Sequence, residues 1–216
     1  MSEEIRMKNP SLLGMITRPT EQFERITASP KIWSALAIIT LLSIIGTWLT
    51  SIGIDVESLE FLTVGEVRES KVFTIIGIII GGLFFPIFTV LIFSFIYWVI
   101  AKIAHLEVSF RHLFSMNTYI LIIPTLSSIV NGIIGLLIES EPNTLFTSLE
   151  SLIVSKGTFG VFLNNMEIFK VWEVIITTIG LQKVANYSKG FAWTISIAFF
   201  VITIIFMIIN FKLNGI

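Results

Sequence analysis

The chain has 216 residues, of which 54% are hydrophobic and only 13% are charged, and its formal net charge is −1. A soluble domain has about 25% charged residues, so this composition leaves too little polar surface to face water. The balanced charge also argues against a nucleic-acid-binding surface. We therefore expect an integral membrane protein surrounded by lipid. Cysteine is absent, which excludes disulfides and thiolate metal sites.

Apolar runs define the predicted elements in chain order. A membrane-spanning helix needs about 20 apolar residues, and four runs reach that length, at about 32–54, 72–103, 113–138 and 191–211. The second run is overlong and contains Pro86, so we expect it to tilt, kink or project beyond the hydrocarbon. Residues 1–31 precede the first span, and Pro19 divides their apolar stretches into two expected short helices that lie on the cytoplasmic membrane surface.

A fifth apolar stretch, residues 165–181, is shorter and contains Lys170 and Glu173. We predict that it also crosses the membrane, because this places every basic loop on one side. The basic residues on that side are Arg6, Lys8, Arg18, Arg25, Lys31, Lys102, Arg111, Lys183 and Lys189. The predicted fold is therefore an all-α, polytopic membrane protein. Residues 32–216 form one domain with five transmembrane helices, the N-terminus is cytoplasmic, and the C-terminus is outside.

Glu173 is the first candidate for a functional role, because an ionisable group at depth in a membrane usually faces a partner or water. In the functional interpretation, Glu173 pairs with a partner protein or carries a proton. In the structural interpretation, it is protonated or hydrogen-bonded inside the bundle, or it lies close enough to the outer interface to reach water. Lys170 either extends toward the interface or pairs with Glu173 one turn later.

Small residues mark candidate helix-packing faces. Gly77 and Gly81 are four apart and are followed by Gly82, and a second stripe on the third run comprises Ser128, Asn131, Gly132 and Gly135. Such residues let helix backbones approach closely. Contact within the chain is the favoured interpretation, with a homo-oligomer or partner seam as the alternative. Asn131 is expected to form hydrogen bonds between helices.

Catalytic and metal-binding motifs are missing from the sequence. His105 and His112 are the two histidines, and no further nitrogen or thiolate ligand lies near them in the sequence. Nothing resembles a phosphate-binding loop or a nucleophile elbow. We therefore predict no catalytic residue, no metal and no cofactor, and a protein that is not an enzyme.

Two motifs resemble a known family. The first runs from Leu12 to Ile26 around Pro19, and the second comprises Glu167, Phe169, Trp172, Glu173 and Gly180. Together they resemble the Yip family of Ypt/Rab-interacting membrane proteins, in its bacterial branch. The resemblance implies five spans, a cytoplasmic N-terminus and a non-enzymatic membrane adaptor, with the second motif as the candidate contact site. Some bacterial relatives accompany ABC-type exporters and help cells survive toxic peptides.

The first functional hypothesis is therefore a scaffold or assembly factor in the plasma membrane of a bacterium. It would act as an accessory subunit of an ABC-type exporter in toxin or antimicrobial-peptide resistance. The alternative is a small transporter or channel in which Glu173 lies on a polar path.

Overall fold

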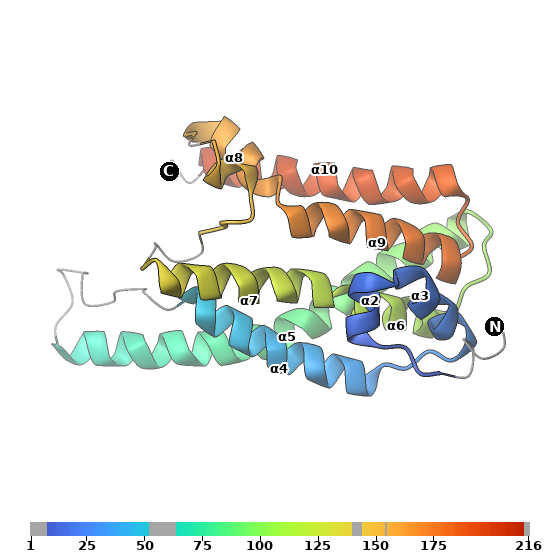
Figure 1. Ribbon diagram of the computed structural model, residues 1–216, viewed down its shortest axis with the longest axis horizontal. Coiled ribbons are helices and arrows are strands. Elements are labelled where there is room, and N and C mark those ends of the chain that lie inside the picture. The colour runs from blue at the N-terminus through green and yellow to red at the C-terminus, as the bar shows by residue number, and fades with distance from the viewer. Residues whose placement is uncertain (1–7, 52–63, 140–143, 154, 214–216) are drawn as a thin grey trace.

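The computed structural model describes residues 8–51, 64–139, 144–153 and 155–213, and these are helical almost throughout. The longer helices run side by side along one axis (Figure 1). The described residues contain no strand beyond one isolated β-bridge, so the predicted all-α class is confirmed. The elements in chain order are α2 (Leu12–Thr17), α3 (Pro19–Ala28), α4 (Trp33–Ser51), α5 (Val64–Ile103), α6 (Phe110–Ile120), α7 (Ile122–Leu137), a short 3₁₀ turn (Leu149–Ser151), α8 (Gly157–Asn165), α9 (Ile168–Val184) and α10 (Lys189–Leu213).

Four helical segments of the described chain are long and apolar enough to cross a bilayer. They are Trp33–Ser51, Ile75–Ile103, Phe110–Leu137 and Lys189–Leu213, and they coincide with four of the five predicted spans. Residues 52–54, the end of the first predicted span, lie outside the described residues. Helix α9 has 17 residues and is about 25 Å long, so it is not among these four.

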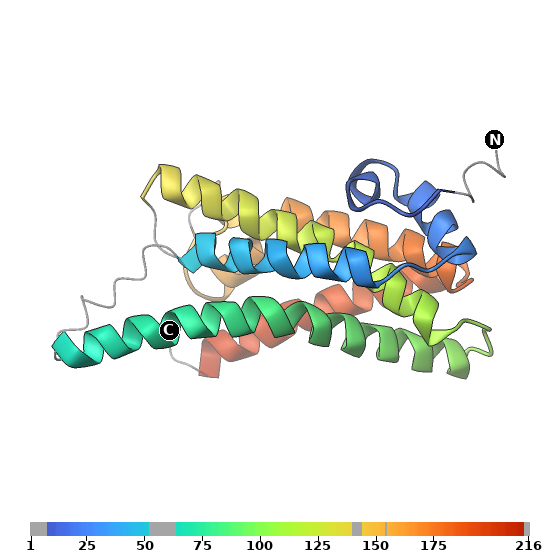
Figure 2. The ribbon, with the colours of Figure 1, turned by 90° about the horizontal axis from the view of Figure 1, so that it is seen from below.

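Helix α5 is much longer than a bilayer requires. Its 40 residues extend over about 60 Å, roughly twice the hydrocarbon thickness, and its N-terminal part runs past the other helices (Figure 2). Pro86 lies inside this helix, which continues on both sides of it. The N-terminal part of α5 therefore projects beyond the neighbouring helices of the bundle (Figure 2).

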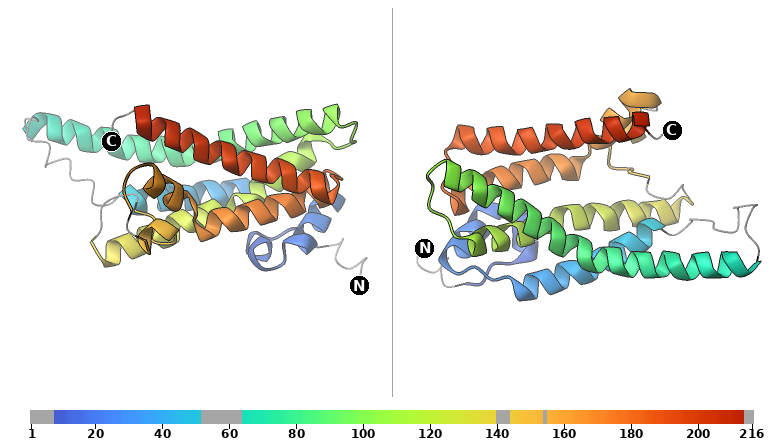
Figure 3. Two further views of the ribbon diagram at one scale, coloured as in Figure 1. Left: turned by 90° about the horizontal axis from the view of Figure 1, so that it is seen from above. Right: turned by 180° about the vertical axis from the view of Figure 1, so that it is seen from behind.

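The third predicted span is divided into α6 and α7 at Leu121. Pro124 has no backbone N–H, and its ring would clash with the carbonyl four residues earlier, that of Ile120. The helix therefore ends at Ile120 and begins again at Ile122. The two segments nevertheless continue along the same direction (Figure 3).

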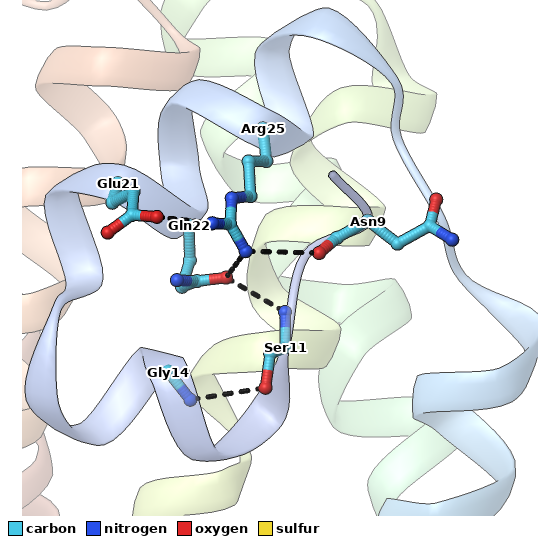
Figure 4. A network of polar contacts seen from close by, with 6 residues as sticks. All are labelled: Asn9, Ser11, Gly14, Glu21, Gln22 and Arg25. Atoms are coloured by element: carbon cyan, nitrogen blue, oxygen red, sulfur yellow. Dashed lines mark hydrogen bonds and ion pairs between the residues drawn. The ribbon is translucent and has the colours of Figure 1, made fainter. Parts of the chain in front are cut away.

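The N-terminal segment forms a helical hairpin that is part of the core. Met15, Phe23 and Ile26 are fully buried, and α3 packs against α9 and α6. A polar network closes the hairpin (Figure 4): Gln22 Oε1 accepts from Ser11 N at 2.9 Å and from Arg25 Nη1 at 3.4 Å. The expected division into two short helices is present, and both helices pack against the bundle.

One end of the bundle, here called the basic end, is where α5 and α9 finish and α10 begins. Lys102, Lys183 and Lys189 lie there. The hairpin is joined to this end, because Thr27 Oγ1 donates to the Lys183 carbonyl at 3.2 Å and Lys183 Nζ lies 3.0 Å from Glu24 Oε1.

Candidate polar site around Glu167 and Glu173

Glu167 is held at the start of α9 by pairing with the preceding loop. It precedes the helix in an extended conformation and forms an antiparallel β-bridge with Ser148. The Ile168 amide donates to the Thr147 carbonyl at 3.2 Å, and the Leu149 amide donates to the Met166 carbonyl at 3.1 Å. This backbone pairing fixes the position from which the Glu167 side chain reaches α7.

The Glu167 carboxylate is the centre of a buried polar cluster. Its side chain is only 2% exposed, and its Oε1 accepts from Ser127 Oγ, from Asn131 Nδ2 at 3.1 Å and from Thr147 Oγ1 at 2.8 Å. A buried carboxylate needs such donors, because its desolvation is otherwise uncompensated. Asn131 therefore forms the interhelical hydrogen bonds expected of it, and the cluster joins α7 to the start of α9.

Glu173 lies in the second turn of α9 and faces two cavities. One, of about 50 Å³, lies between α5, α6 and α9, and the other, of about 130 Å³, lies between α5, α9 and α10. Phe93, Tyr97, Thr177 and Glu173 itself line both. In the described part of the chain, no side chain forms a hydrogen bond or ion pair with the Glu173 carboxylate.

The other residues of the predicted contact motif have separate surroundings. Lys170 Nζ donates to Asn165 Oδ1 at 2.8 Å and forms no ion pair with Glu173 within the described residues. Phe169 and Trp172 are half-buried and pack against the hydrophobic core. The motif is therefore not one surface patch: Glu167 stabilises a loop, the aromatic residues pack, and Glu173 faces the cavities.

Gly180 lies where α9 packs closely against α3 and α6. A Cβ at this position would lie 2.9 Å from both Phe23 Cζ and Met116 Sδ, closer than ordinary van der Waals contact. Glycine thus lets α3 lie directly on α9. This gives a structural reason for a residue that the family resemblance singled out.

The predicted helix-packing residues fall into two groups. A Cβ at Gly82 would lie 2.7 Å from Ile44 Cα, and one at Gly132 would lie 2.6 Å from Leu49 Cβ, so both glycines contact α4. Nothing lies within 4 Å of a Cβ at Gly77 or Gly81. The favoured intramolecular contact is therefore not formed by these two glycines within the described residues.

Two further residues of the α7 stripe complete this description. Ser128 Cβ lies 3.0 Å from the position of a Cβ on Gly46, so this serine lies at the contact between α4 and α7. Gly135, two turns after Ser128, is half-buried.

Several residues of the site were not predicted from the sequence. Ser127 lies one helical turn before Asn131, and this spacing places both on one face of α7, so the sequence held that signal. Thr147, Tyr97, Phe199 and Ser196 reach the site from other elements. Only the three-dimensional arrangement brings Thr147 to Glu167 and the other three residues to the larger cavity beside Glu173.

No group of three potential metal ligands from His, Asp and Glu is present among the described residues. His112 instead lies 2.6 Å from Ser109 Oγ through Nδ1, and 3.3 Å from the Thr27 carbonyl through Nε2.

The fold and the buried polar site define a multi-pass, all-helical membrane protein. The chain belongs to the Yip1 domain family, which matches residues 13–210. It is similar to the membrane protein YknW of Bacillus subtilis (strain 168), with 30% identity over 215 residues, covering 97% of this chain and 93% of the relative. No solved structure matches the chain. These findings agree with a bacterial multi-pass membrane protein and with the family resemblance noted from the sequence.

Proposed function

We propose that this protein is a non-enzymatic membrane scaffold or assembly factor with five spans, a cytoplasmic N-terminus and an external C-terminus. Helix α9 is the fourth span in chain order in this proposal, and α10 is the fifth. The α9 span is supported by the position of α9 beside α10 along the bundle axis (Figure 1). It is also supported by the three lysines at the basic end, since basic residues favour the cytoplasmic side.

Topology is testable independently of function. A reporter readable only from the cytoplasm, inserted between Lys183 and Lys189, should be active, and the same reporter after Ile216 should be silent. A silent reporter between the two lysines would mean that α9 does not cross the membrane.

The functional proposal is an accessory subunit of a bacterial ABC-type exporter that acts in resistance to toxins or antimicrobial peptides. The observation that carries it is the open face of α5 around Gly77 and Gly81. Both glycines have free space over them, and Phe73, Ile80 and Phe84 nearby are exposed. Two small residues four apart let another transmembrane helix approach closely. The family membership supports an integral membrane role, and the exporter is the proposed partner.

Leucine substitutions on α5 test this surface. Tagged wild-type protein, purified from native membranes in mild detergent, should carry exporter subunits, and the double variant Gly77→Leu/Gly81→Leu should lose them. Gly190→Leu is the matched control, because a Cβ at Gly190 also meets nothing within 4 Å and lies on a different helix. Equal recovery from all three proteins would overturn the role of the α5 face.

A deletion strain tests the biological role. Loss of the protein should reduce the amount of assembled exporter and raise sensitivity to a toxic peptide that the exporter removes. The Gly77→Leu/Gly81→Leu variant should fail to restore both, whereas Gly190→Leu should restore them. Normal exporter assembly in the deletion strain would refute the assembly function.

A second candidate function is a small transporter or channel, favoured by the two cavities that meet at Glu173. Reconstituted wild-type protein should then show solute or proton flux above empty liposomes, and Glu173→Gln should abolish it. Background flux from the wild type would eliminate this candidate and leave the scaffold proposal intact.

A further inference from the structure

The larger cavity is lined by polar groups without partners. Ser196 is 3% exposed, and its Oγ has no hydrogen-bond partner among the described residues. Glu173 lines the same cavity and has no ion pair in that part of the chain. Buried polar groups in proteins are nearly always satisfied. An orphaned hydroxyl and a carboxylate on one cavity therefore indicate a ligand that supplies positive charge or hydrogen-bond donors.

Aromatic rings also line this cavity. The centroid of Phe199, on α10, lies 5.7 Å from that of Phe93 and 5.6 Å from that of Tyr97, both on α5. The Phe93 and Tyr97 centroids are 6.1 Å apart, and all three residues line the cavity. The faces of aromatic rings attract cations, and organic ammonium groups are recognised in this way.

The chemistry of the wall selects the kind of cation. A bare divalent metal ion needs several oxygen ligands, and Glu173 is the single carboxylate among the residues lining the larger cavity. The cavity volume of about 130 Å³ approaches the roughly 150 Å³ of a protein cavity that binds benzene. A compact organic cation fits this volume and can contact both the aromatic rings and the Glu173 side chain.

Lys170 is the competing positive charge within the chain. It lines the same cavity, but its Nζ donates to Asn165 Oδ1 at 2.8 Å. Glu167, the other nearby acid, is occupied by donors from Ser127, Asn131 and Thr147. The Glu173 carboxyl group therefore remains the acidic group that can pair with a cationic ligand, and the Lys170 charge weakens cation binding.

We propose that Glu173, Ser196 and the rings of Phe93, Tyr97 and Phe199 form a binding site for a small organic ammonium cation. This site does not depend on the exporter role, because it lies between α5, α9 and α10 and away from the open glycine face. The ammonium group belongs either to a soluble amine or to a phospholipid headgroup, and both sources present the same chemistry.

Binding is measured with radiolabelled tetramethylammonium and purified full-length protein in nanodiscs of phosphatidylglycerol. Wild-type protein should bind one equivalent saturably, and choline should compete. The neutral isostere of choline, 3,3-dimethylbutan-1-ol, should not compete, because it lacks the charge. Equal competition by the alcohol would show that the cavity recognises shape alone, and absence of saturable binding to wild-type protein would refute the site.

Variants connect the binding to the proposed residues. Glu173→Gln should weaken binding at least about tenfold, as expected for loss of one charged partner, and Lys170→Met should strengthen it. Glu107→Gln, at an exposed acid far from the cavity in the sequence, is the control and should bind like wild type. Unchanged binding by folded Glu173→Gln would overturn the proposal. If that variant fails to fold, Phe199→Leu keeps the test decisive, since it must also weaken binding.

Nanodisc composition separates the two sources. If the natural ligand is a lipid headgroup, replacing part of the phosphatidylglycerol by phosphatidylethanolamine should reduce tetramethylammonium binding in wild-type protein. Unchanged binding would assign the site to a soluble amine.

Discussion

The contact between α4 and α5 gives a sharp test of the structure, because adjacent glycines of α5 face opposite environments. Gly82 is buried against Ile44, with its Cβ position 2.7 Å from Ile44 Cα and 2.9 Å from Ile44 N. Gly81 has nothing within 4 Å. Alanine at either position adds the same methyl group to the same helix, so only the surroundings differ.

The expected magnitudes follow from these distances. Alanine in place of glycine inside a helix stabilises it by about 1 kcal/mol, and this gain applies to both variants. Gly82→Ala must also separate two backbones, and overpacking of this kind costs about 2–3 kcal/mol. We therefore expect Gly81→Ala to raise the free energy of unfolding by about 1 kcal/mol and Gly82→Ala to lower it by about 1–2 kcal/mol.

Unfolding in detergent micelles, followed by tryptophan fluorescence, measures this difference. For a chain of this size the two variants should differ in melting temperature by about 4–12 °C. Adding Ile44→Ala to Gly82→Ala should not restore stability, because the close contacts include backbone atoms of Ile44. Equal melting temperatures for the two glycine variants would show that α4 and α5 do not meet at Gly82.

Three further predictions concern other parts of the bundle and use the same unfolding assay. Glu167→Ala should lower stability by about 3 kcal/mol, because it removes the buried acceptor that Ser127, Asn131 and Thr147 share; a loss below about 1 kcal/mol would argue against the buried cluster. Burial raises the pKa of Tyr187 to about 12, so the folded state keeps a proton that the unfolded state loses above about pH 10, and stability should fall between these two values. Tyr187→Phe should remove that fall and cost about 1 kcal/mol at neutral pH, since the hydroxyl donates to the Tyr97 carbonyl at 2.8 Å; an unchanged alkaline fall would exclude Tyr187 as its cause. Phe23→Ala should cost about 3–4 kcal/mol because the ring is fully buried, whereas Glu24→Gln, in an exposed ion pair, should change stability by less than about 1 kcal/mol.

The sequence predicted the helices well because apolar run length and proline position act locally. Pro19 separates α2 from α3, and Pro124 interrupts the third run at Leu121. A run of apolar residues in lipid must form a helix, since every backbone group needs an internal partner. Helix α8 was missed because its nine residues are too few for a spanning run.

The composition of this chain by itself determined a membrane protein of several helices, because its few charged residues are confined to short segments. The tertiary structure alone decided which small and polar residues meet. Gly82 contacts α4, whereas a Cβ on Gly81, one residue earlier, would meet nothing within 4 Å. Glu167 is hydrogen-bonded to Asn131, whereas Glu173 faces two cavities. Helical periodicity predicts which residues lie on the same face of a helix. Which other helix packs against that face depends on the tertiary structure. That packing depends on contacts between segments far apart in the chain.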